Sequence, residues 1–558
     1  MCGLAGWATT NAAPDVRALG PMVEVLAHRN EGENVCAVLD RQPRRTVVLA
    51  ASLSDTAIGI SLALDGAILN AAELRSQLGK RGHQFKTKTD AELLLRAYQH
   101  WDKEVVKQLR GAFALAIWDA RKQRLMLARD RFGQKPLHLY QLGATLFFAS
   151  EVKALVRAPG IKAEVDVEAV GDYLAQRYVR GPRTLVAGVR KLSPGTYALW
   201  QFGALRETRY WSPPDGEAFL KRAPEKPIDG FIDRLDEAVQ LHMDSAHPVG
   251  ALLSGGYDSA AIVALMKTHS EYVTTFSAGF ADDKRSELAA AARVAKHFGT
   301  QHHEIVLERR DVLAQLPQLV ASRDAPFSRP ADVALHLLAR QASRKVKVAL
   351  SGDGGDEILG GYRRHTFLRS LAPGMKKVNG LFIIPVADPQ EPAPVEGRSS
   401  QLRRILYYEQ VGWLADNLLE RTDRVTAAAS LELRAPFLDH RVAEYVSALP
   451  DAARVRGWST KWILRKADER LIAQAGIDAG VKPRKAGFRI ALADLMRGEM
   501  RELVIEHLRG PGCLTRAYYE GAVLDRMLDE HLAARKNHEE TLWTLLNLEI
   551  WHRTYRLS

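Results

Sequence analysis

The stretch ALLSGGYDSAAIVAL, residues 251–265, constrains the fold of this 558-residue chain more than any other segment. It starts as a short apolar run, turns through Ser-Gly-Gly-Tyr-Asp-Ser and continues as an apolar helix. In a parallel sheet, ligands bind at the carboxyl ends of the strands, where such a turn lies. Glycines there let phosphate oxygens approach the backbone, and N–H groups at the helix start favour negative charge. The stretch therefore predicts a parallel α/β sheet with a phosphate-binding loop.

The side chains of this loop indicate which phosphate chemistry it serves. Ser254 and Ser259 add hydroxyl donors, whereas the carboxylate of Asp258 would repel phosphate unless a Mg²⁺ ion lay between them. The lysine of a Walker A loop is absent, so the loop is not one that transfers a γ-phosphate. The alternative is purely structural, namely a Gly-Gly turn in which Asp and Ser cap the helix.

A second glycine-rich turn, LSGDGGDEILGGY at residues 350–362, weakens that structural alternative. It also follows a strand, and Asp353, Asp356 and Glu357 place three carboxylates within five residues. Such carboxylates repel one another, so metal binding or proton transfer is expected here. Two turns of this kind that follow two strands of one sheet would face one pocket.

The pattern of apolar segments predicts two domains. Residues 1–210 form the first, residues 211–229, rich in Pro and charge, are interpreted as a linker, and residues 230–558 form the second. In the first domain we expect a helix at 90–101 and strands at 47–53, 61–64, 111–119, 124–130 and 145–150.

The second domain alternates strands with helices. Strands are expected at 249–254, 272–280 and 346–354, and a helix is expected at 286–299. This alternation favours a parallel sheet with helices on both faces. Residues 383–397 are interpreted as a surface loop.

The two glycine-rich turns carry a family resemblance. SGGYDS resembles the pyrophosphate loop of ATP-pyrophosphatase enzymes, and together with LSGDGGDEILGGYRR it is similar to the synthetase domain of the glutamine-hydrolysing asparagine synthetases. The resemblance is colinear and covers nearly the whole chain. Further matching segments are SLELRAPFLDHRVAEYVSALP (430–450), KWILRKA (461–467), RKAGF (484–488) and LWTLLNLEIW (542–551).

This resemblance implies a ligase reaction in two steps, with ATP and Mg²⁺ as cofactors. ATP and a carboxylate, which the family takes from the side chain of aspartate, give an acyl-adenylate and pyrophosphate. A nitrogen nucleophile then displaces AMP and forms an amide.

The resemblance also assigns roles to residues of the second domain. Asp353 serves adenylate formation or acts as a base, and Lys461 neutralises charge on the departing pyrophosphate. The pyrophosphate and Mg²⁺ contacts fall on Ser254, Gly255, Gly256, Asp258, Ser259 and Asp356, with Asp258 and Asp356 as metal ligands. The nucleotide contacts fall on Leu253, Ser277, Ser351 and Gly352.

The amino-terminal segment MCGLAGW resembles the same family, whose members remove Met1 and use Cys2 as a nucleophile. A thiolate would attack the side-chain amide of glutamine, with the free α-amine as its base. The resemblance implies an αββα sandwich of the N-terminal nucleophile hydrolase type. It extends through RGAFALAIWD (110–119), LARDRFGQKPLH (127–138) and FASEVKAL (148–155).

The expected glutamine pocket departs from the family pattern. HRNEGEN (28–34) stands for H-R-G-P-D, SLSD (52–55) lacks the glutamine-binding arginine, and DGAILN (65–70) stands for N-G-E-I-Y-N. Asp65 therefore replaces an oxyanion-hole amide, Ala67 replaces an acidic contact, and Gly66 and Asp90 match glutamine contacts. Because losing one oxyanion donor costs about 100- to 1,000-fold in rate, we expect glutamine hydrolysis to be weak or absent.

Charge and cysteine content favour some function classes over others. The net charge is +12, but Lys and Arg are spread beside 66 acidic residues, which favours an enzyme with an anionic substrate over a nucleic-acid-binding protein. Three scattered cysteines, no secretory signal and no apolar span point to a cytoplasmic protein without a disulfide framework or membrane anchor.

Two alternatives stay open at this point. A family variant with an impaired glutaminase could use ammonia or another amine on a different carboxylate. Ala325 favours this hypothesis, because many relatives show an acidic residue at this position. A tRNA-modifying enzyme could use the same loop, although Cys36 and Cys513 do not supply the paired cysteines of thiolating members. The expected partners are small molecules, namely aspartate with glutamine or ammonia, and a homodimer is expected.

Overall fold

Two compact units make up the part of the chain that is described. The computed structural model describes residues 3–10, 15–29, 36–42, 45–51, 53–55, 59–214, 225–280, 287–327, 329–367, 381–382, 384, 400–474 and 492–555. The first unit consists of Met1–Glu164, Gly181–Pro213 and Val411–Asp423. The second consists of Val165–Arg180, Pro214–Gln410 and Arg424–Ser558. Neither unit is one continuous stretch, so the domain limits at 210 and 230 stay a prediction.

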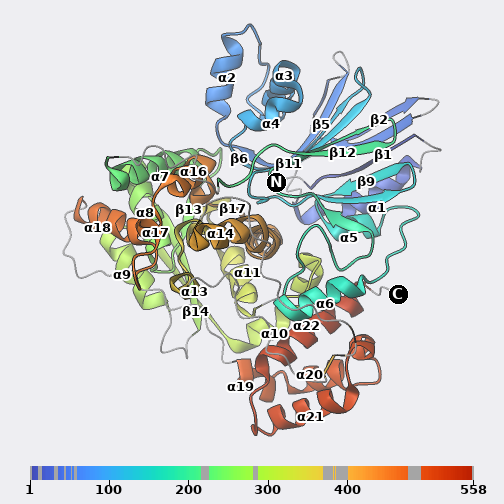
Figure 1. The fold of residues 1–558 in the computed structure, drawn as a ribbon, viewed down its shortest axis with the longest axis vertical. Helices are drawn as coiled ribbons and strands as arrows, with labels where there is room; N and C mark the ends of the chain where they lie inside the picture. Colours follow the sequence, from blue (N-terminus) through green and yellow to red (C-terminus); the bar gives the residue numbers. More distant parts are fainter. Residues whose placement is uncertain are drawn as a thin grey trace. The chain divides into compact units, whose positions relative to one another are not determined.

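Two antiparallel sheets form the first unit (Figure 1). One has the strand order β10-β8-β9-β1-β3-β2 and the other β12-β11-β7-β6-β5-β4. The first sheet contains β1 (Ala5–Thr9), β2 (Cys36–Gln42), β3 (Arg45–Ala51), β8 (His138–Leu142), β9 (Thr145–Ala149) and β10 (Val189–Lys191). The second contains β4 (Leu53–Asp55), β5 (Ile60–Ile68), β6 (Gly111–Asp119), β7 (Arg124–Arg129), β11 (Thr196–Gln201) and β12 (Ala204–Arg209).

Alternating side chains of the strands build two apolar layers in this unit. In β6, Phe113 and Leu115 pack with residues of the helices α2 to α4, whereas Ala114 and Trp118 pack with residues of the other sheet. The helices beside the second sheet are α2 (Ala71–Gly79), α3 (Asp90–Trp101) and α4 (Val105–Gln108), and those beside the first sheet are α1 (Leu19–Glu24) and α5 (Val152–Val156). The expected αββα sandwich is therefore confirmed.

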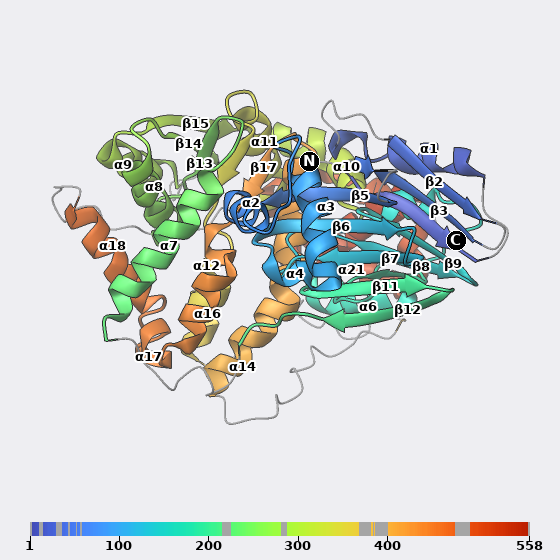
Figure 2. The same cartoon turned by 90° about the horizontal axis from the view of Figure 1, so that it is seen from above.

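The second unit contains a five-stranded parallel sheet, to which the strands β13, β14, β15 and β17 labelled in Figure 2 belong. Its order is β15-β14-β13-β16-β17, with β13 (Val249–Leu252), β14 (Thr274–Phe280), β15 (Gln301–Leu307), β16 (Val348–Leu350) and β17 (Glu432–Arg434). All neighbouring strands in it run parallel. Strands β13 and β16 are direct neighbours, with Ala251 opposite Leu350, so the turns that follow them start at the same edge.

Helices of the second unit pack around this sheet. Helix α8 contacts β13, α9 contacts β14 and β15, and α11 packs on Phe276 of β14. The helices of this unit before residue 367 are α6 (Val167–Gln176), α7 (Pro227–Met243), α8 (Tyr257–His269), α9 (Leu288–Phe298), α10 (Arg309–Arg323), α11 (Ala331–Ala342), α12 (Gly355–Leu359) and α13 (Arg363–Thr366).

One long helical run, of which Val411–Asp423 belong to the first unit, changes its hydrogen-bond pattern. Helix α14 (Gln401–Tyr408) continues as a π-helix over Glu409–Leu419 and then as α15 (Glu420–Ala427). Turns of π-helix are rare in proteins, and those that occur are often found at functional sites. The remaining helices are α16 (His440–Ala448), α17 (Asp451–Arg454), α18 (Trp462–Gln474), α19 (Leu492–Arg497), α20 (Arg501–Leu508), α21 (Gly521–Leu532) and α22 (Glu539–Tyr555).

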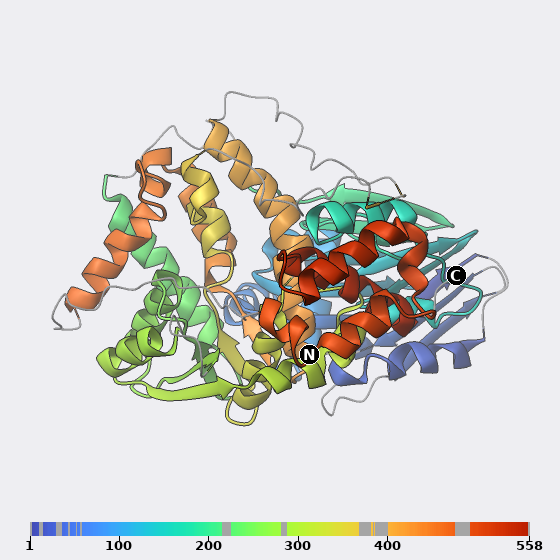
Figure 3. The same cartoon turned by 90° about the horizontal axis from the view of Figure 1, so that it is seen from below.

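The carboxyl-terminal helices α19 to α22 pack on one another in the second unit, as the red ribbons of Figure 3 show. Helix α22 is buried along most of its length. It is also tied to α6, because the hydroxyl of Tyr173 donates to the carbonyl of Thr544 over 3.1 Å. Among the described residues, no helix is both long and apolar enough to cross a membrane.

Most predicted elements are confirmed by this architecture. The helix expected at 90–101 is α3, the strand expected at 272–280 is β14, and the helix expected at 286–299 is α9. The run at 47–53 spans the end of β3 and the start of β4. The proposed linker is described only at 211–214 and 225–229, and the loop at 383–397 lies outside the described residues except Ile384.

Candidate active site

The loop after β13 is closed by its own hydroxyl groups. Leu253 N–H donates to the carbonyl of Phe276 over 2.8 Å. Leu253 is the first residue after β13, so this bond to β14 fixes the point at which the chain leaves the sheet. Ser254 Oγ and Ser259 Oγ lie 3.1 Å apart, and Gly256 N–H donates to Ser254 Oγ over 3.3 Å. Gly255 has a φ of +74°, and a Cβ there would lie 2.6 Å from the backbone of Ala290. Only glycine therefore suits this position beside α9.

The second turn packs directly on this loop. A Cβ added to Gly352 would lie 2.6 Å from Asp258 Cβ, and one added to Gly355 would lie 2.5 Å from Asp258 Oδ1. Ser351 Oγ donates to Asp353 Oδ2 over 3.1 Å and thereby fixes this carboxylate. The two turns that the sequence predicts to face one pocket thus lie in contact.

Lys461 joins the two turns. Its ammonium nitrogen lies 2.6 and 2.5 Å from the two oxygens of Asp258 and 2.7 Å from Asp356 Oδ1. The three side chains are 6%, 18% and 14% exposed, respectively. Lys461 has a φ of +52° just before α18, and a Cβ on Gly361 would overlap both Asp356 Oδ1 and Lys461 Cε. The arrangement is therefore tightly packed as well as ion-paired.

Two further buried acids, Asp468 and Glu357, lie around this cluster. Burial and the nearby Asp258 raise the pKa of Asp468 well above its ordinary value, against the opposing effect of Lys461. Burial and the adjacent Asp356 raise the pKa of Glu357 to about 7. Both shifts have the sign expected when a carboxylate leaves water and meets a second negative charge.

Ser277, an expected nucleotide contact, is turned toward the neighbouring strand. Its hydroxyl lies 3.1 Å from His302 Nε2, and the other ring nitrogen lies 2.9 Å from Thr275 Oγ1. Ser277 is buried, and it is the first residue of β14 beyond the register with β13. Its assignment to the nucleotide therefore stays a prediction.

Glu409 and Gln410, at the start of the π-helix, also contact the second turn. Glu409 accepts from Arg364 and pairs with His365, and Gln410 donates to the carbonyl of Glu357. No sequence motif at 409–410 predicts these contacts with the second turn, because they join segments more than 40 residues apart.

The residues fit a magnesium nucleotide. Asp258 and Asp356 already share one cation, the Lys461 ammonium, so a divalent cation that both carboxylates share is compatible with their spacing. Oxygen ligands from phosphates and water would complete such a site. Among the described residues, no group of three or more His, Cys, Asp or Glu side chains is placed to hold a metal alone.

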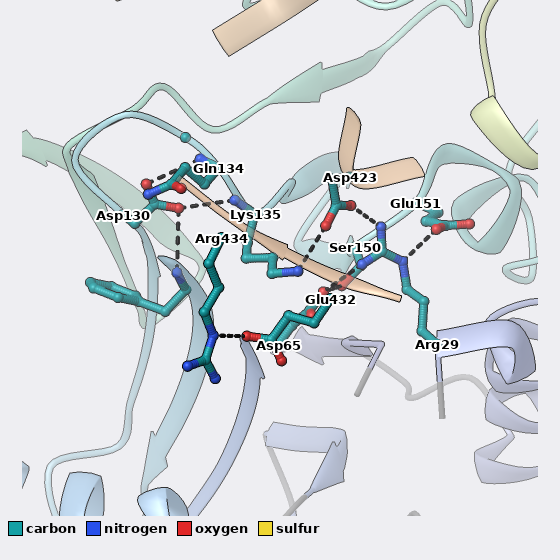
Figure 4. A network of polar contacts seen from close by, with 12 residues as sticks. Arg29, Asp65, Asp130, Gln134, Lys135, Ser150, Glu151, Asp423, Glu432 and Arg434 are labelled. Atoms are coloured by element: carbon teal, nitrogen blue, oxygen red, sulfur yellow. Dashed lines mark hydrogen bonds and ion pairs between the residues drawn. The ribbon is translucent and has the colours of Figure 1, made fainter. Parts of the chain in front are cut away.

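The expected glutaminase site lies in the first unit, and Cys2 itself falls outside the described residues. Asp65 is fully buried in this unit (Figure 4). Its Oδ2 lies 3.1 Å from Arg29 Nη1 and accepts from Ser150 Oγ over 3.1 Å. Ser150 Oγ in turn accepts from Leu4 N–H over 2.9 Å. Asp65 is thus a buried, paired carboxylate that is linked to the amino-terminal strand.

Arg29 is the centre of a larger network. Its guanidinium pairs with Glu151, Nε to Oε1 over 2.5 Å, and with Asp423, in addition to Asp65. Lys135 Nζ lies 2.8 Å from the other oxygen of Asp423. Burial would raise the pKa of Asp423, but Arg29 and Lys135 outweigh it and lower this pKa to about 2.

The other expected glutamine contacts have structural partners. Asp90 Oδ2 accepts from Ile68 N–H over 2.9 Å at the start of α3. Gly66 has a φ of +110°, and a Cβ there would overlap the carbonyl oxygen of Ala112. Sequence reasoning missed Arg29, Lys135 and Asp423. Arg29 and Lys135 lie in segments 28–34 and 127–138, which were compared with the family pattern, whereas Asp423 lies in no such segment.

Comparisons with known proteins agree with this two-part organisation. The asparagine synthase family matches residues 230–553, and a glutamine amidotransferase domain matches residues 1–211. Asparagine synthetase [glutamine-hydrolyzing] 1 of Bacillus subtilis is 30% identical over 553 residues, covering 88% of this chain and 84% of that protein. A putative asparagine synthetase [glutamine-hydrolyzing] of Mycobacterium bovis is 33% identical over 557 residues with the same coverage.

An amidotransferase domain followed by a synthetase domain defines the class, which is that of C–N bond-forming ligases. The chain belongs to the family of glutamine-hydrolysing asparagine synthetases. Among solved structures, a glutamine phosphoribosylpyrophosphate amidotransferase from B. subtilis aligns with a TM-score of 0.28 and 16% identity over 54% of this chain and 65% of that one, which is too low to support an inference.

Proposed function

We propose that this chain is an ATP-dependent ligase that amidates a carboxylate, in the first instance the side chain of aspartate. A carboxylate oxygen attacks the α-phosphorus of ATP, the bond from that phosphorus to the bridging oxygen breaks, and pyrophosphate leaves. An ammonia nitrogen then attacks the acyl carbon and loses a proton, and AMP departs with the electrons of the C–O bond. The observation that supports this proposal is the bridge from Lys461 to Asp258 and Asp356 across two neighbouring turns.

The residues of the two turns have distinct tasks in this proposal. Backbone N–H groups and hydroxyls of the 254–259 loop bind the pyrophosphate portion, because glycines leave the backbone open to phosphate oxygens. Lys461 stabilises the negative charge that develops on the departing pyrophosphate. Asp353, held by Ser351, accepts the proton that the attacking nitrogen loses.

Asp258 and Asp356 would hold Mg²⁺, with Lys461 as the neighbouring fixed cation. When bound, the ion would neutralise phosphate charge and polarise the phosphoryl oxygens. The Asp258–Lys461 pair ties the 254–259 loop to the start of α18.

A second candidate concerns the nitrogen source, and the pairing of Asp65 with Arg29 favours it. A carboxylate, unlike an amide, offers no N–H donor to a developing oxyanion, and loss of one such donor costs about 100- to 1,000-fold. In this candidate the amino-terminal unit hydrolyses glutamine poorly, and the ligase uses free ammonia or another amine.

The test is pyrophosphate release with ATP, Mg²⁺ and candidate acids, with glutamine or ammonia supplied in separate assays. Aspartate-dependent pyrophosphate release with formation of asparagine supports the proposal. Pyrophosphate release that depends on a different acid would mean that the enzyme amidates that acid instead of aspartate. ATP hydrolysis to ADP and phosphate contradicts both.

A further inference from the structure

A network of buried side chains holds residues 360–366, the segment that follows the carboxylates of Asp356 and Glu357 in the second turn. Glu409 is its central member and lies at the first position of the π-helix. Its carboxylate is buried and accepts from two consecutive residues of that segment. Arg364 Nε lies 2.7 Å from Oε1, and His365 Nε2 lies 2.9 Å from Oε2.

The hydrogen bonds fix which nitrogen of His365 carries the proton. Tyr362 N–H donates to His365 Nδ1 over 3.3 Å, so Nδ1 is an acceptor. In the neutral ring Nε2 then carries the hydrogen and donates to Glu409. Glu409 therefore receives two donors, one on each oxygen, from both residues that follow Arg363.

A second set of contacts leads from this segment to the carboxylates. The guanidinium of Arg364 lies 3.9 Å above the ring of Tyr362, whose hydroxyl donates to the buried carboxylate of Glu357. Gln410 Nε2 donates to the carbonyl of Glu357 over 3.3 Å. Two consecutive residues, Glu409 and Gln410, thus hold both ends of the segment from 357 to 365.

The braced segment touches the Lys461 cluster directly. Glu357 follows Asp356 on α12, and Gly361 N–H donates to the carbonyl of Asp356 over 2.8 Å. Gly361 lies so close to Asp356 and Lys461 that no Cβ fits between them. A shift of Gly361 toward the cluster would therefore displace Asp356 or Lys461.

We infer that Glu409 is a positioning residue for the ligase reaction: by holding Arg364 and His365 it sets the distance from Asp356 to Lys461. This inference rests on the proposed function. It assigns Glu409 no contact with substrate and explains why a charged side chain is buried at the start of the π-helix.

The substitution Glu409→Gln tests this role. In glutamine an NH₂ group replaces one of the two carboxylate oxygens, so either Arg364 or His365 would face a second donor in place of its acceptor. We expect kcat for pyrophosphate release to fall about 10- to 100-fold, as for small misplacements of catalytic groups, while KM for ATP changes less than about threefold. Gln410→Leu, which removes one neutral hydrogen bond, should give a smaller fall in kcat in the same direction.

Glu549→Gln is the matched control, because Glu549 is also a buried carboxylate that accepts from Thr515 and Arg553 but lies among the carboxyl-terminal helices. It should lower the melting temperature without changing kcat more than about twofold. A Glu409→Gln protein that stays folded and keeps kcat within twofold of wild type overturns the inference.

Crystal structures of wild type and Glu409→Gln separate this inference from the proposed function. We expect the distance from Lys461 Nζ to Asp356 Oδ1 to lengthen in the variant, whatever reaction the protein catalyses. An unchanged distance contradicts the positioning role. A wild-type protein that releases no pyrophosphate contradicts the proposed function and leaves the distance measurement valid.

Discussion

The ammonium group of Lys461 lies within 2.6 Å of both carboxylate oxygens of Asp258, a residue 203 positions earlier in the chain. Both side chains are mostly buried, so the pair is shielded from solvent screening. This contact ties the start of α18 to the loop that follows β13. It places a fixed positive charge where the proposed reaction develops negative charge.

Replacing Lys461 with Met should lower kcat for pyrophosphate release by about 100- to 1,000-fold, because one preorganised electrostatic contact to the leaving group is lost. Lys466→Met is the control. Lys466 lies on α18, five residues after Lys461, and its side chain is 41% exposed and pairs only with Glu469 among the described residues. Its replacement should leave kcat within twofold. Equal effects of the two substitutions would show that Lys461 has no special role.

Gly361→Ala should disrupt the same cluster by volume alone. The added Cβ would overlap Asp356 Oδ1 and Lys461 Cε, so these groups must move apart. We expect a fall in kcat of about 100-fold, the typical cost of an ångström-scale misplacement. Gly79→Ala, which meets no atom within 4 Å, serves as the control. Wild-type kcat in Gly361→Ala would contradict the packing described for the second turn.

The amino-terminal unit should release glutamate from glutamine slowly. Asp65 pairs with Arg29 and accepts from Ser150, and its side chain has no N–H donor for an oxyanion. Glutamate release by wild type and Cys2→Ala should both stay near background, and both proteins should keep the same ammonia-dependent activity. Rapid glutamate release that disappears in Cys2→Ala would refute this expectation.

The Asp423 carboxylate should make stability depend on acid pH. Its pKa in the folded state is about 2, below the ordinary value of 3.8, because Arg29 and Lys135 outweigh burial. A depressed pKa gives stability that is present above pH 4 and is lost as the pH falls toward 2, and here it is on the order of 2 kcal/mol.

Urea unfolding of wild type and Asp423→Asn at several pH values checks this contribution. The difference in the free energy of unfolding should be largest above pH 4 and should shrink between pH 4 and pH 2. A difference that stays constant over this range would mean that Asp423 titrates normally in the folded protein.

Local sequence patterns were sufficient to predict the two turns and their convergence. A strand that enters a glycine-rich turn and a helix sets backbone geometry within a dozen residues, so Asp258 and Asp356 could be placed at one sheet edge before the strand order was known. Lys461 came only from the family resemblance, since a single lysine before a helix has no pattern of its own.

Other contacts could not be predicted in this way, because they depend on tertiary packing. Glu409 reaches the second turn through partners 44 and 45 residues away, and Arg29 meets Asp423 across 394 residues. Neither pairing leaves a periodic or local trace. The family pattern predicts that Asp65 replaces an oxyanion-hole amide, but it does not predict the buried guanidinium partner that the fold gives this residue.

The identity of the nucleotide products tests the central claim most directly. Phosphorus-31 NMR of a reaction with ATP, Mg²⁺, aspartate and ammonia should show AMP and pyrophosphate in equal amounts, formed only when both aspartate and enzyme are present. ADP and inorganic phosphate as the products would contradict cleavage between the α and β phosphorus atoms, and with it the roles given to Asp258, Asp356 and Lys461.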